Sequence, residues 1–399
     1  MLDTAGQRVW TEVDLDAVAH NLRQVRELMQ GTKIMGIVKD DAYGHGAVEC
    51  TRVLEKNGVD FFGVATIGEA LELRQAGIRS DILILGWTDP DQAALLAEHD
   101  LIQTVVDVPY ARELNARGLK LRTHVKADTG MNRIGISWQP QKKDLDGFFE
   151  VYAMKNLSNE GIFSHYPVSD DLGEDAMAFT GRQTTMFQEL VSILKENGID
   201  PGLVHIQNSY GILNYGDMGF DYCRPGLLYM GVTSNDAIPV VNDLDFIPAL
   251  SLRTRVEMVK DLQPGQTVSY GRHHEVQQPE TIASLAIGYG DGLPRLISNK
   301  DLTVLVNGQE ARLVGNICMD QCMADVTGLD VKPGDVVTLI GEDGRKRVTV
   351  DAITRCSESI NNETFCRLTK RVPRFFTGTG DPDAVRKQAA DQEDADGGH

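Results

Sequence analysis

Eight short apolar runs, each followed by a stretch of helical periodicity, occupy the first 230 residues of the chain. The helical patterns include GEALELRQAG at 68–77 and DQAALLAEHD at 91–100. The eight runs lie at 33–39, 61–65, 81–86, 101–106, 121–128, 161–166, 203–208 and 222–226. Successive strand–helix units predict an α/β fold of the (β/α)8 TIM-barrel type. An open doubly wound sheet is the alternative, although it usually has fewer strands.

Polar or ionisable side chains stand at the ends of several of these runs. In such barrels the active site lies at the carboxyl ends of the strands. Charge is disfavoured in a core, so its recurrence at one end of successive apolar strands indicates a site. The residues concerned are Lys39, Lys126, His165, Asn208 and Arg224.

A different pattern begins near residue 240. Strand-like pieces now alternate with turn signals, of which VNG at 306–308 is typical of a hairpin. We therefore predict a barrel over 8–240 and a mostly β domain over 241–376. The strand-like segment 8–15 could pair with either domain. The polar, acidic tail 377–399 is expected to be disordered.

Charge and cysteine usage narrow the function classes. The chain has 399 residues and a formal net charge of −19, which disfavours nucleic acid as a partner. No stretch of about 20 apolar residues predicts a transmembrane helix, and the start resembles no signal peptide. Six scattered cysteines indicate reduced thiols in a cytoplasmic protein. No metal site is expected, because Asp320 and Asp325 lack clustered partners.

Several candidate residues have both a chemical and a structural interpretation. Desolvation lowers the pKa of a lysine, so Lys39 could attack an aldehyde, or it could simply reach solvent from the strand end. His165 could be an ordinary core histidine. Asn208 and Ser209 could cap a helix or hold a phosphate. Arg224 could point into the barrel mouth, and GYGDG at 288–292 lacks the residues of a P-loop.

Nine strings, taken together and in order, resemble the pyridoxal-phosphate alanine racemase family. The strings are VKDDAYGHG, KADTGMNRIG, SHY, QNSYG, RPGLLYMG, VSYGR, GYGDGLPR, GNICMDQCMADVT and RVPRFF. The resemblance covers roughly residues 8–376. It implies a barrel followed by a β domain, a small amino-acid substrate, and a head-to-tail homodimer whose sites use residues of both chains.

The resemblance also implies a role for individual residues in binding pyridoxal 5'-phosphate. Lys39 matches the lysine that forms a Schiff base with it, and Arg224 matches the arginine facing its pyridine nitrogen. His165 matches the residue that holds Arg224. The remaining positions assigned to the cofactor are Tyr43, Asn208, Ser209, Gly226, Leu227 and Tyr289.

For the substrate, the resemblance implies two catalytic bases on opposite faces, Lys39 and the partner subunit's Tyr270. Tyr270 would need a lowered pKa, for which Arg224 and His165 are the expected positive charges. The positions assigned to substrate binding are Arg133, Met319, Lys126 and Asn362, of which Lys126 matches a lysine that is carbamylated in many members.

Two positions depart from the family pattern. Asp40 stands where alanine is common. Asn362 replaces a tyrosine that lines the substrate entrance, as in the serine racemases of vancomycin resistance, which also carry a membrane domain. The prediction is therefore an alanine racemase with serine activity, and a serine-preferring racemase is the alternative. A pyridoxal-dependent amino-acid decarboxylase and a cofactor-carrier protein are less favoured, because neither fits the β-domain strings as well.

Overall fold

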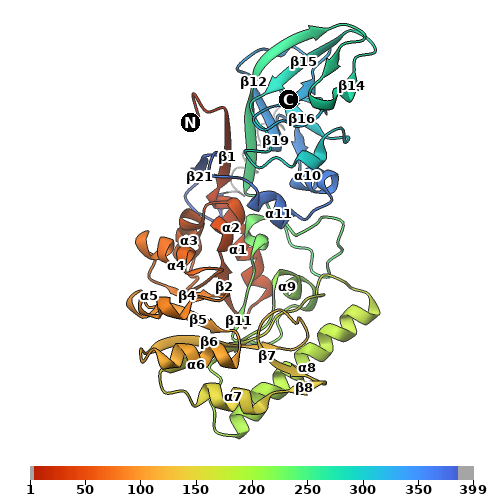
Figure 1. Cartoon of the computed structure of the whole chain (residues 1–399). Helices are drawn as coiled ribbons and strands as arrows, with labels where there is room; N and C mark the ends of the chain where they lie inside the picture. The colour runs from red at the N-terminus through yellow and green to blue at the C-terminus, as the bar shows by residue number, and fades with distance from the viewer. Residues whose placement is uncertain (1–3, 385–399) are drawn as a thin grey trace.

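The computed structural model describes residues 4–384 as a barrel with a β domain stacked on it (Figure 1). Eight parallel strands close the barrel, since β2 pairs with β11 and β5 pairs with β6. The predicted (β/α)8 barrel and following β domain are therefore confirmed. The barrel strands are β2 (Lys33–Ile37), β3 (Phe61–Val64), β4 (Asp81–Ile84), β5 (Ile102–Val105), β6 (Leu121–Asp128), β9 (Leu157–Phe163), β10 (Leu203–His205) and β11 (Tyr222–Cys223).

Every predicted barrel strand is present, and the largest difference is in β9. This strand begins at Leu157 rather than residue 161, because Leu157 pairs with Leu121 on β6. Its polar first half carries Glu160, which accepts hydrogen bonds from Arg122 of β6 at 2.9 and 3.1 Å. A strand stabilised by such a cross-strand ion pair does not show as an apolar run.

Helices cover the outside of the barrel strands, and several of them begin at a side-chain cap. Thr66 and Glu69 form a reciprocal capping box at the start of α4. The helices are α1 (Leu15–Leu28), α2 (Lys39–Gly44), α3 (Ala47–Lys56), α4 (Ile67–Gln75), α5 (Ala93–Glu98), α6 (Val108–Ala116), α7 (Leu145–Tyr152), α8 (Glu174–Glu196) and α9 (Ser209–Tyr215). A small ribbon of β7 (Ile136–Gln139) and β8 (Lys142–Lys143) extends from β6.

The β domain is built on a nine-stranded sheet in the order β20-β19-β16-β17-β18-β15-β12-β1-β21. The hairpin predicted at VNG joins β16 to β17. The strands are β12 (Leu250–Leu262), β15 (Glu280–Leu285), β16 (Thr303–Val306), β17 (Gln309–Val314), β18 (Cys322–Asp325), β19 (Val336–Asp343), β20 (Lys346–Val348) and β21 (Arg374–Thr377). Two short strands, β13 (Thr267–Val268) and β14 (His274–Glu275), form a separate ribbon, and α10 (Val350–Ser357) and α11 (Asn361–Cys366) complete the domain.

The N-terminal strand β1 (Val9–Asp14) belongs to this β domain, which answers the question the sequence left open. It pairs antiparallel with β12 and parallel with β21. The chain thus starts in one domain, forms the barrel, and returns to the first domain to finish.

The expectation of disorder from residue 377 is wrong for 377–384. The backbone N–H groups of Thr379 and Asp381 both donate to the buried Asp16 carboxylate of α1, each at 2.8 Å. Arg23 of the same helix pairs with Asp383 at 2.6 Å. A buried carboxylate needs donors, and this acidic segment supplies them from its backbone. The rest of the predicted disordered tail, 385–399, lies outside the described residues.

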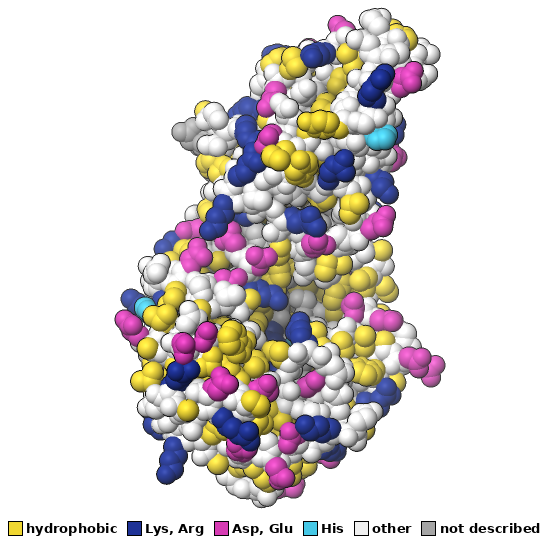
Figure 2. Space-filling model, in the orientation of Figure 1, with side chains coloured by type: hydrophobic (Ala, Val, Ile, Leu, Met, Phe, Trp, Pro, Cys, Tyr) yellow, Lys and Arg dark blue, Asp and Glu magenta, His cyan; other side chains and the backbone are white. Residues whose placement is uncertain are grey.

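Figure 2 shows Lys and Arg side chains around a hollow between the barrel and the β domain, on a surface where acidic and basic groups are otherwise mixed. Within residues 4–384, no helix has the length and apolar character needed to cross a bilayer. All six cysteines are free thiols. The same residues contain no group of three His, Cys, Asp or Glu side chains suited to a metal ion.

Candidate active site

Lys39 follows β2 after one residue, at the carboxyl end of the barrel strands, as predicted. Its side chain is largely enclosed, and burial together with the charge of Arg133 lowers the pKa of its amine. A lowered pKa increases the neutral fraction of the amine near pH 7. Lys39 is therefore suited to nucleophilic and proton-transfer chemistry rather than to solvent exposure.

The turn after Lys39 has an unusual backbone. Asp40, Asp41, Ala42 and Tyr43 all have φ between 51° and 54°, so α2 is a left-handed turn. Each left-handed non-glycine residue costs about 1–2 kcal/mol. The turn directs the Tyr43 hydroxyl to Gly226 so closely that a Cβ at Gly226 would collide with it. Strain of this kind persists where surrounding contacts fix the backbone.

Tyr43 helps to form a polar cradle, by which we mean Tyr43, Ser209, Gly226 and Leu227. The Gly226 backbone N–H donates to Ser209 Oγ at 3.1 Å. Tyr43, Ser209 and Leu227 line one small cavity. The structure places Asn208 as the cap of α9, where its Oδ1 accepts from Gly211 N at 2.9 Å. The predicted phosphate-binding positions thus converge, with the Asn208 side chain used for capping.

Arg224 lies fully inside the barrel end and is held by four contacts. Its Nη2 donates to the carbonyl oxygens of Ser164 and Ile206 at 2.7 and 2.9 Å and lies 3.2 Å from His165 Nδ1. Its Nη1 lies 2.7 Å from His205 Nδ1. Burial lowers the pKa of Arg224 to about 9, so the guanidinium remains charged at pH 7.

The sequence reasoning missed His205 and His124 as supports of Arg224. Since Arg224 can only donate, His205 Nδ1 accepts, and His205 Nε2–H donates to His124 Nδ1 at 3.0 Å. Burial lowers the pKa of both rings, that of His124 to about 3. His124 and His205 belong to strands β6 and β10, within the strings HVK and LVH. The signal that could have revealed them is a polar ring on an otherwise apolar strand.

His165 carries no positive charge at neutral pH. Burial and the neighbouring Arg224 hold the pKa of His165 well below its usual value. The expectation that His165 helps Arg224 to lower the pKa of Tyr270 by positive charge is therefore wrong. Arg224 is the charged member of this pair.

Lys126 is buried at the end of β6 and donates to the Ala127 carbonyl at 3.0 Å. Burial, together with Arg224, lowers the pKa of Lys126 to about 7. About half of such amines are neutral at pH 7, which is the form that reacts with electrophiles. Arg133 lies near enough to contribute to the same shift, although its own side chain is exposed.

Three predicted site residues of the β domain, Tyr270, Met319 and Tyr289, lie exposed on the surface of the chain instead of joining the cradle. Tyr270 is 72% exposed, Met319 52% and Tyr289 42%. The Tyr270 carbonyl accepts from Asn316 at 2.7 Å, and the Met319 carbonyl accepts from Gly290 N at 2.8 Å. Tyr270 lies between β13 and β14 in the β domain. All three side chains are therefore open to solvent in the single chain.

Asn362 joins the polar cradle from α11. It lines the same small cavity as Tyr43, Ser209 and Leu227, beside Thr233 and Ser234. Its Oδ1 is buried and has no hydrogen-bond partner within residues 4–384. An unsatisfied buried amide oxygen is costly, about 1–3 kcal/mol, and indicates a missing ligand or water.

Asp40, the second departure, points to the surface. Its backbone N–H donates to Glu69 at 2.7 Å, and its carboxylate lies near Cys366 of α11. Burial and this carboxylate raise the pKa of the Cys366 thiol to about 12. The thiol is therefore protonated and unreactive at neutral pH.

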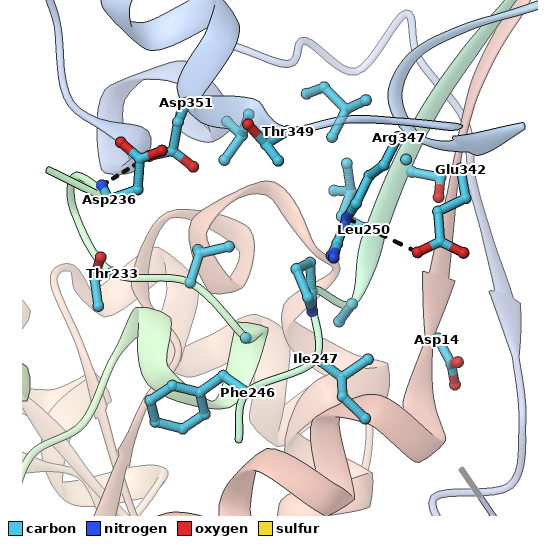
Figure 3. A pocket seen from close by; sticks show the side chains of 18 of the residues that line it. Asp14, Thr233, Asp236, Phe246, Ile247, Leu250, Glu342, Arg347, Thr349 and Asp351 are labelled. Carbon is cyan, nitrogen blue, oxygen red and sulfur yellow. Dashed lines mark hydrogen bonds and ion pairs between the residues drawn. The ribbon is translucent and has the colours of Figure 1, made fainter. Parts of the chain in front are cut away.

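A large cavity lies elsewhere, between the barrel and the β domain (Figure 3). It has a volume of about 860 Å³ and is lined by the linker 231–251 and the segment 340–351. Its acidic groups include Asp14, Asp236 and Asp351. None of the predicted catalytic or cofactor residues lines it, so it is separate from the site around Lys39.

Four buried histidines make the fold sensitive to acid. Burial lowers the pKa of His45 to about 4 and that of His124 to about 3, and holds those of His165 and His205 well below normal. The unfolded chain therefore binds more protons below about pH 6.5, so stability falls as pH falls, by about 1.4 kcal/mol per pH unit for each histidine.

Denaturant titrations between about pH 7 and 5 should show this loss of unfolding free energy. His124→Gln is the control, because removing one buried imidazole should reduce the slope by about one proton. A free energy of unfolding that stays constant over this pH range would contradict the assignment of neutral buried rings.

Two family models match the chain. The alanine racemase N-terminal domain matches residues 13–234, and the alanine racemase C-terminal domain matches residues 249–376. Alanine racemase 1 of Clostridium acetobutylicum is 38% identical over 386 residues, covering 95% of this chain and 97% of the relative. Alanine racemase 2 of Caldanaerobacter subterraneus subsp. tengcongensis is 39% identical, covering 93% and 95%.

Solved structures agree with this assignment. The alanine racemase of Clostridium difficile has a TM-score of 0.85 at 34% identity, covering 94% of this chain and 96% of that one. The Bacillus anthracis alanine racemase with bound L-Ala-P has a TM-score of 0.86 at 33% identity, with the same coverage. The histidine racemase of Leuconostoc mesenteroides is more distant, with a TM-score of 0.81 at 28% identity, covering 94% and 99%. With both of its domains matched and its relatives similar over nearly their whole length, this chain belongs to the alanine racemase family.

Proposed function

We propose that this protein is a pyridoxal-phosphate-dependent amino-acid racemase that interconverts L- and D-alanine and also acts on serine. The observation that carries the proposal is the path from Lys39 through one left-handed turn to Tyr43, whose hydroxyl meets the Gly226 backbone of the polar cradle. A reactive amine and an anion-binding cradle are thereby fixed at one end of the barrel.

The residues fit pyridoxal 5'-phosphate. Glycine at 226 leaves the cradle open where a Cβ would fill it, and Ser209 and Tyr43 offer hydroxyl groups to a phosphate. Lys39 would hold the aldehyde end, and Arg224 would face the pyridine nitrogen. When bound, the cofactor withdraws electrons from the substrate Cα–H bond. Tyr289 is exposed on the β domain, so its assignment to the cofactor requires a second subunit.

Racemisation needs a proton acceptor on one face of the substrate and a proton donor on the other. Lys39 supplies one group, because its lowered pKa leaves a neutral amine available. The second group is the partner subunit's Tyr270. Its exposure on the β domain supports this role, since a phenol directed away from its own barrel is free to enter another. A head-to-tail homodimer would also bring the partner subunit's Met319 to the substrate beside Arg133.

Arg224 favours return of the proton to the substrate Cα because its guanidinium stays charged. Four contacts fix its guanidinium, and with its pKa near 9 it gives no proton to the cofactor ring at pH 7. Beside an unprotonated ring, negative charge at the substrate Cα would be stabilised less strongly. That charge would then be short-lived, which favours return of the proton to Cα. The family models that span both domains support a racemase over a decarboxylase or a carrier protein.

The deciding experiment compares kcat/KM for L-alanine and L-serine on protein loaded with the cofactor. A ratio above about tenfold for alanine, which is about 1.4 kcal/mol, makes alanine the substrate. Equal or greater efficiency with serine supports the alternative, a serine-preferring racemase. Asn362 is the feature that favours serine activity, because it stands where the family commonly has a tyrosine at the substrate entrance and its amide could bond a serine hydroxyl.

Asn362→Tyr should shift the preference toward alanine. A ring at this position fills the space beside Tyr43 and Ser209 and removes the amide. Apolar walls discriminate against an added hydroxyl by at most about 10²-fold, so we expect a change of about tenfold in the serine-to-alanine ratio of kcat/KM. Asn361→Ala is not a suitable control, because Asn361 is bonded to Thr233, Asp351 and Thr354. Asn362→Ala serves better, and an unchanged ratio in both variants would remove Asn362 from the specificity.

A further inference from the structure

The loop that carries Lys39 and Tyr43 is in contact with the β domain of its own chain. We call residues 39–46 the lysine loop. Gly44 lies against the carbonyl of Phe365, where any Cβ would collide with that oxygen, and a Cβ on Gly46 would collide with the ring of Phe376. The His45 ring packs edge-on against Phe365 with centroids 4.7 Å apart. The loop is therefore enclosed by α11 on one side and β21 on the other.

One side chain ties these pieces together. Arg374 of β21 donates from Nε to the Gly44 carbonyl at 3.1 Å, and the same nitrogen lies 3.3 Å from Asp41 Oδ2. Its other nitrogens donate to the carbonyls of Leu368, Thr369 and Val372 at 2.9–3.1 Å. The Arg374 side chain is only 13% exposed. Its planar donors thus join the turn after α11 to the lysine loop, as a single ammonium group could not.

The lysine loop needs such support. Four consecutive left-handed residues cost several kcal/mol in sum, at about 1–2 kcal/mol each. Internal hydrogen bonds offset part of this conformational cost, among them Ala42 N to Val38 O at 3.0 Å and Gly46 N to Asp41 O at 2.9 Å. Asp41 also accepts from Ala47 N at 2.8 Å. Arg374 contacts Asp41 and Gly44, two of the residues through which the turn returns to α3.

We propose that Arg374 is a positioning residue that holds the strained lysine loop, and with it Lys39 and Tyr43, through contacts from the β domain. The part of this inference that concerns catalysis rests on the proposed function, whereas the part that concerns the loop does not. Loss of Arg374 should release the left-handed turn, move the Tyr43 hydroxyl away from Gly226 and weaken the cofactor cradle, with the barrel and the β sheet otherwise folded.

The test uses Arg374→Gln and Arg374→Lys, with Arg253→Gln as the matched control. Arg253 is a comparably enclosed β-domain arginine, 21% exposed, that pairs with Glu12 and donates to Thr338, away from the lysine loop. Hydrogen exchange of the peptide covering 39–47 is measured on full-length protein, with and without pyridoxal phosphate. We expect at least tenfold faster exchange at the Ala42 and Gly46 amides in Arg374→Gln, a smaller increase in Arg374→Lys, and no local increase in Arg253→Gln.

A second measurement is the dissociation constant of pyridoxal phosphate from each variant. It should rise at least tenfold in Arg374→Gln and less than twofold in Arg253→Gln. Exchange in the lysine loop equal to that of Arg253→Gln overturns the inference, and so does failure of both Arg374 variants to fold, since Arg374 would then be a general stabiliser of the β domain. A wild-type protein without racemase activity would refute the proposed function but leave the exchange result to decide the role of Arg374.

Discussion

Mixing two inactive variants, Lys39→Ala and Tyr270→Ala, should restore activity. If each site takes Lys39 from one chain and Tyr270 from the other, a mixed dimer has one site with both lesions and one intact site. After exchange of subunits in equal amounts, half of the dimers are mixed, so total activity should reach about one quarter of wild type. Each variant alone should lose at least about 10²-fold in kcat, the usual contribution of a general acid or base.

The mixture is prepared by co-expression with different affinity tags, and racemisation is followed by optical rotation. The control is a mixture of Lys39→Ala with Lys39→Gln, in which every site lacks the amine and activity stays at the level of the parents. Activity that does not rise in the first mixture, although mixed dimers are recovered, would show that each site is built from one chain. The experiment thus tests whether Tyr270, which is 72% exposed in the single chain, serves the site of the partner subunit.

Replacing Arg224 by glutamate should convert part of the racemase activity into transamination. A carboxylate at this position could keep a proton on the pyridine nitrogen of the cofactor. Negative charge developing at the substrate Cα would then be stabilised for longer, and the proton could more often return to an atom other than Cα. We expect racemisation to fall at least about 10²-fold and pyruvate to form from alanine. The free energy of unfolding should also fall by about 3 kcal/mol, because four buried contacts are lost.

Arg224→Lys is the matched control, because it keeps the positive charge and loses the fork geometry. It should lower the rate without producing pyruvate. Pyruvate formation by folded, cofactor-loaded Arg224→Glu that does not exceed that of Arg224→Lys would show that the guanidinium does not set the direction of proton return. Thermal melts of both variants establish that the comparison is made on folded protein.

The barrel was predictable because its strands are buried on both faces and read as apolar runs. β2, β3 and β4 lie within three residues of their predicted ends for this reason. β9 was misplaced at its start because Glu160 pairs with Arg122 across the sheet, and ion pairs leave no apolar signal. The position of β1 was not decidable, since an amphipathic strand fits the edge of either domain. Its partners lie about 240 and 360 residues away along the chain.

The site was predictable to a lesser degree. Lys39, Arg224 and Ser209 follow apolar strands, and this placement was visible in the sequence. The left-handed turn at Asp40–Tyr43 was not, because no glycine occupies these four positions to signal positive φ. His205 and His124 sit inside strands, where a histidine is ordinarily a core residue. The segment 377–384 looked disordered because its bonds to Asp16 use the backbone, which composition does not report.

β1 lies next to β21 in the sheet, although the barrel and most of the β domain separate them in the chain. This arrangement limits when the sheet can form during synthesis. β1 precedes the barrel in the chain, whereas β12 and β21 follow it, so β1 is synthesised before either of its partner strands. Except for the closing pair of β2 with β11, the barrel strands pair with near neighbours in the chain and can assemble during translation, whereas pairing over long separations is slow. Until β12 and β21 have been synthesised, both edges of β1 lack their partner strands. A fragment that starts after the barrel would lack the strand between β12 and β21, so the two domains cannot be separated by a single cut.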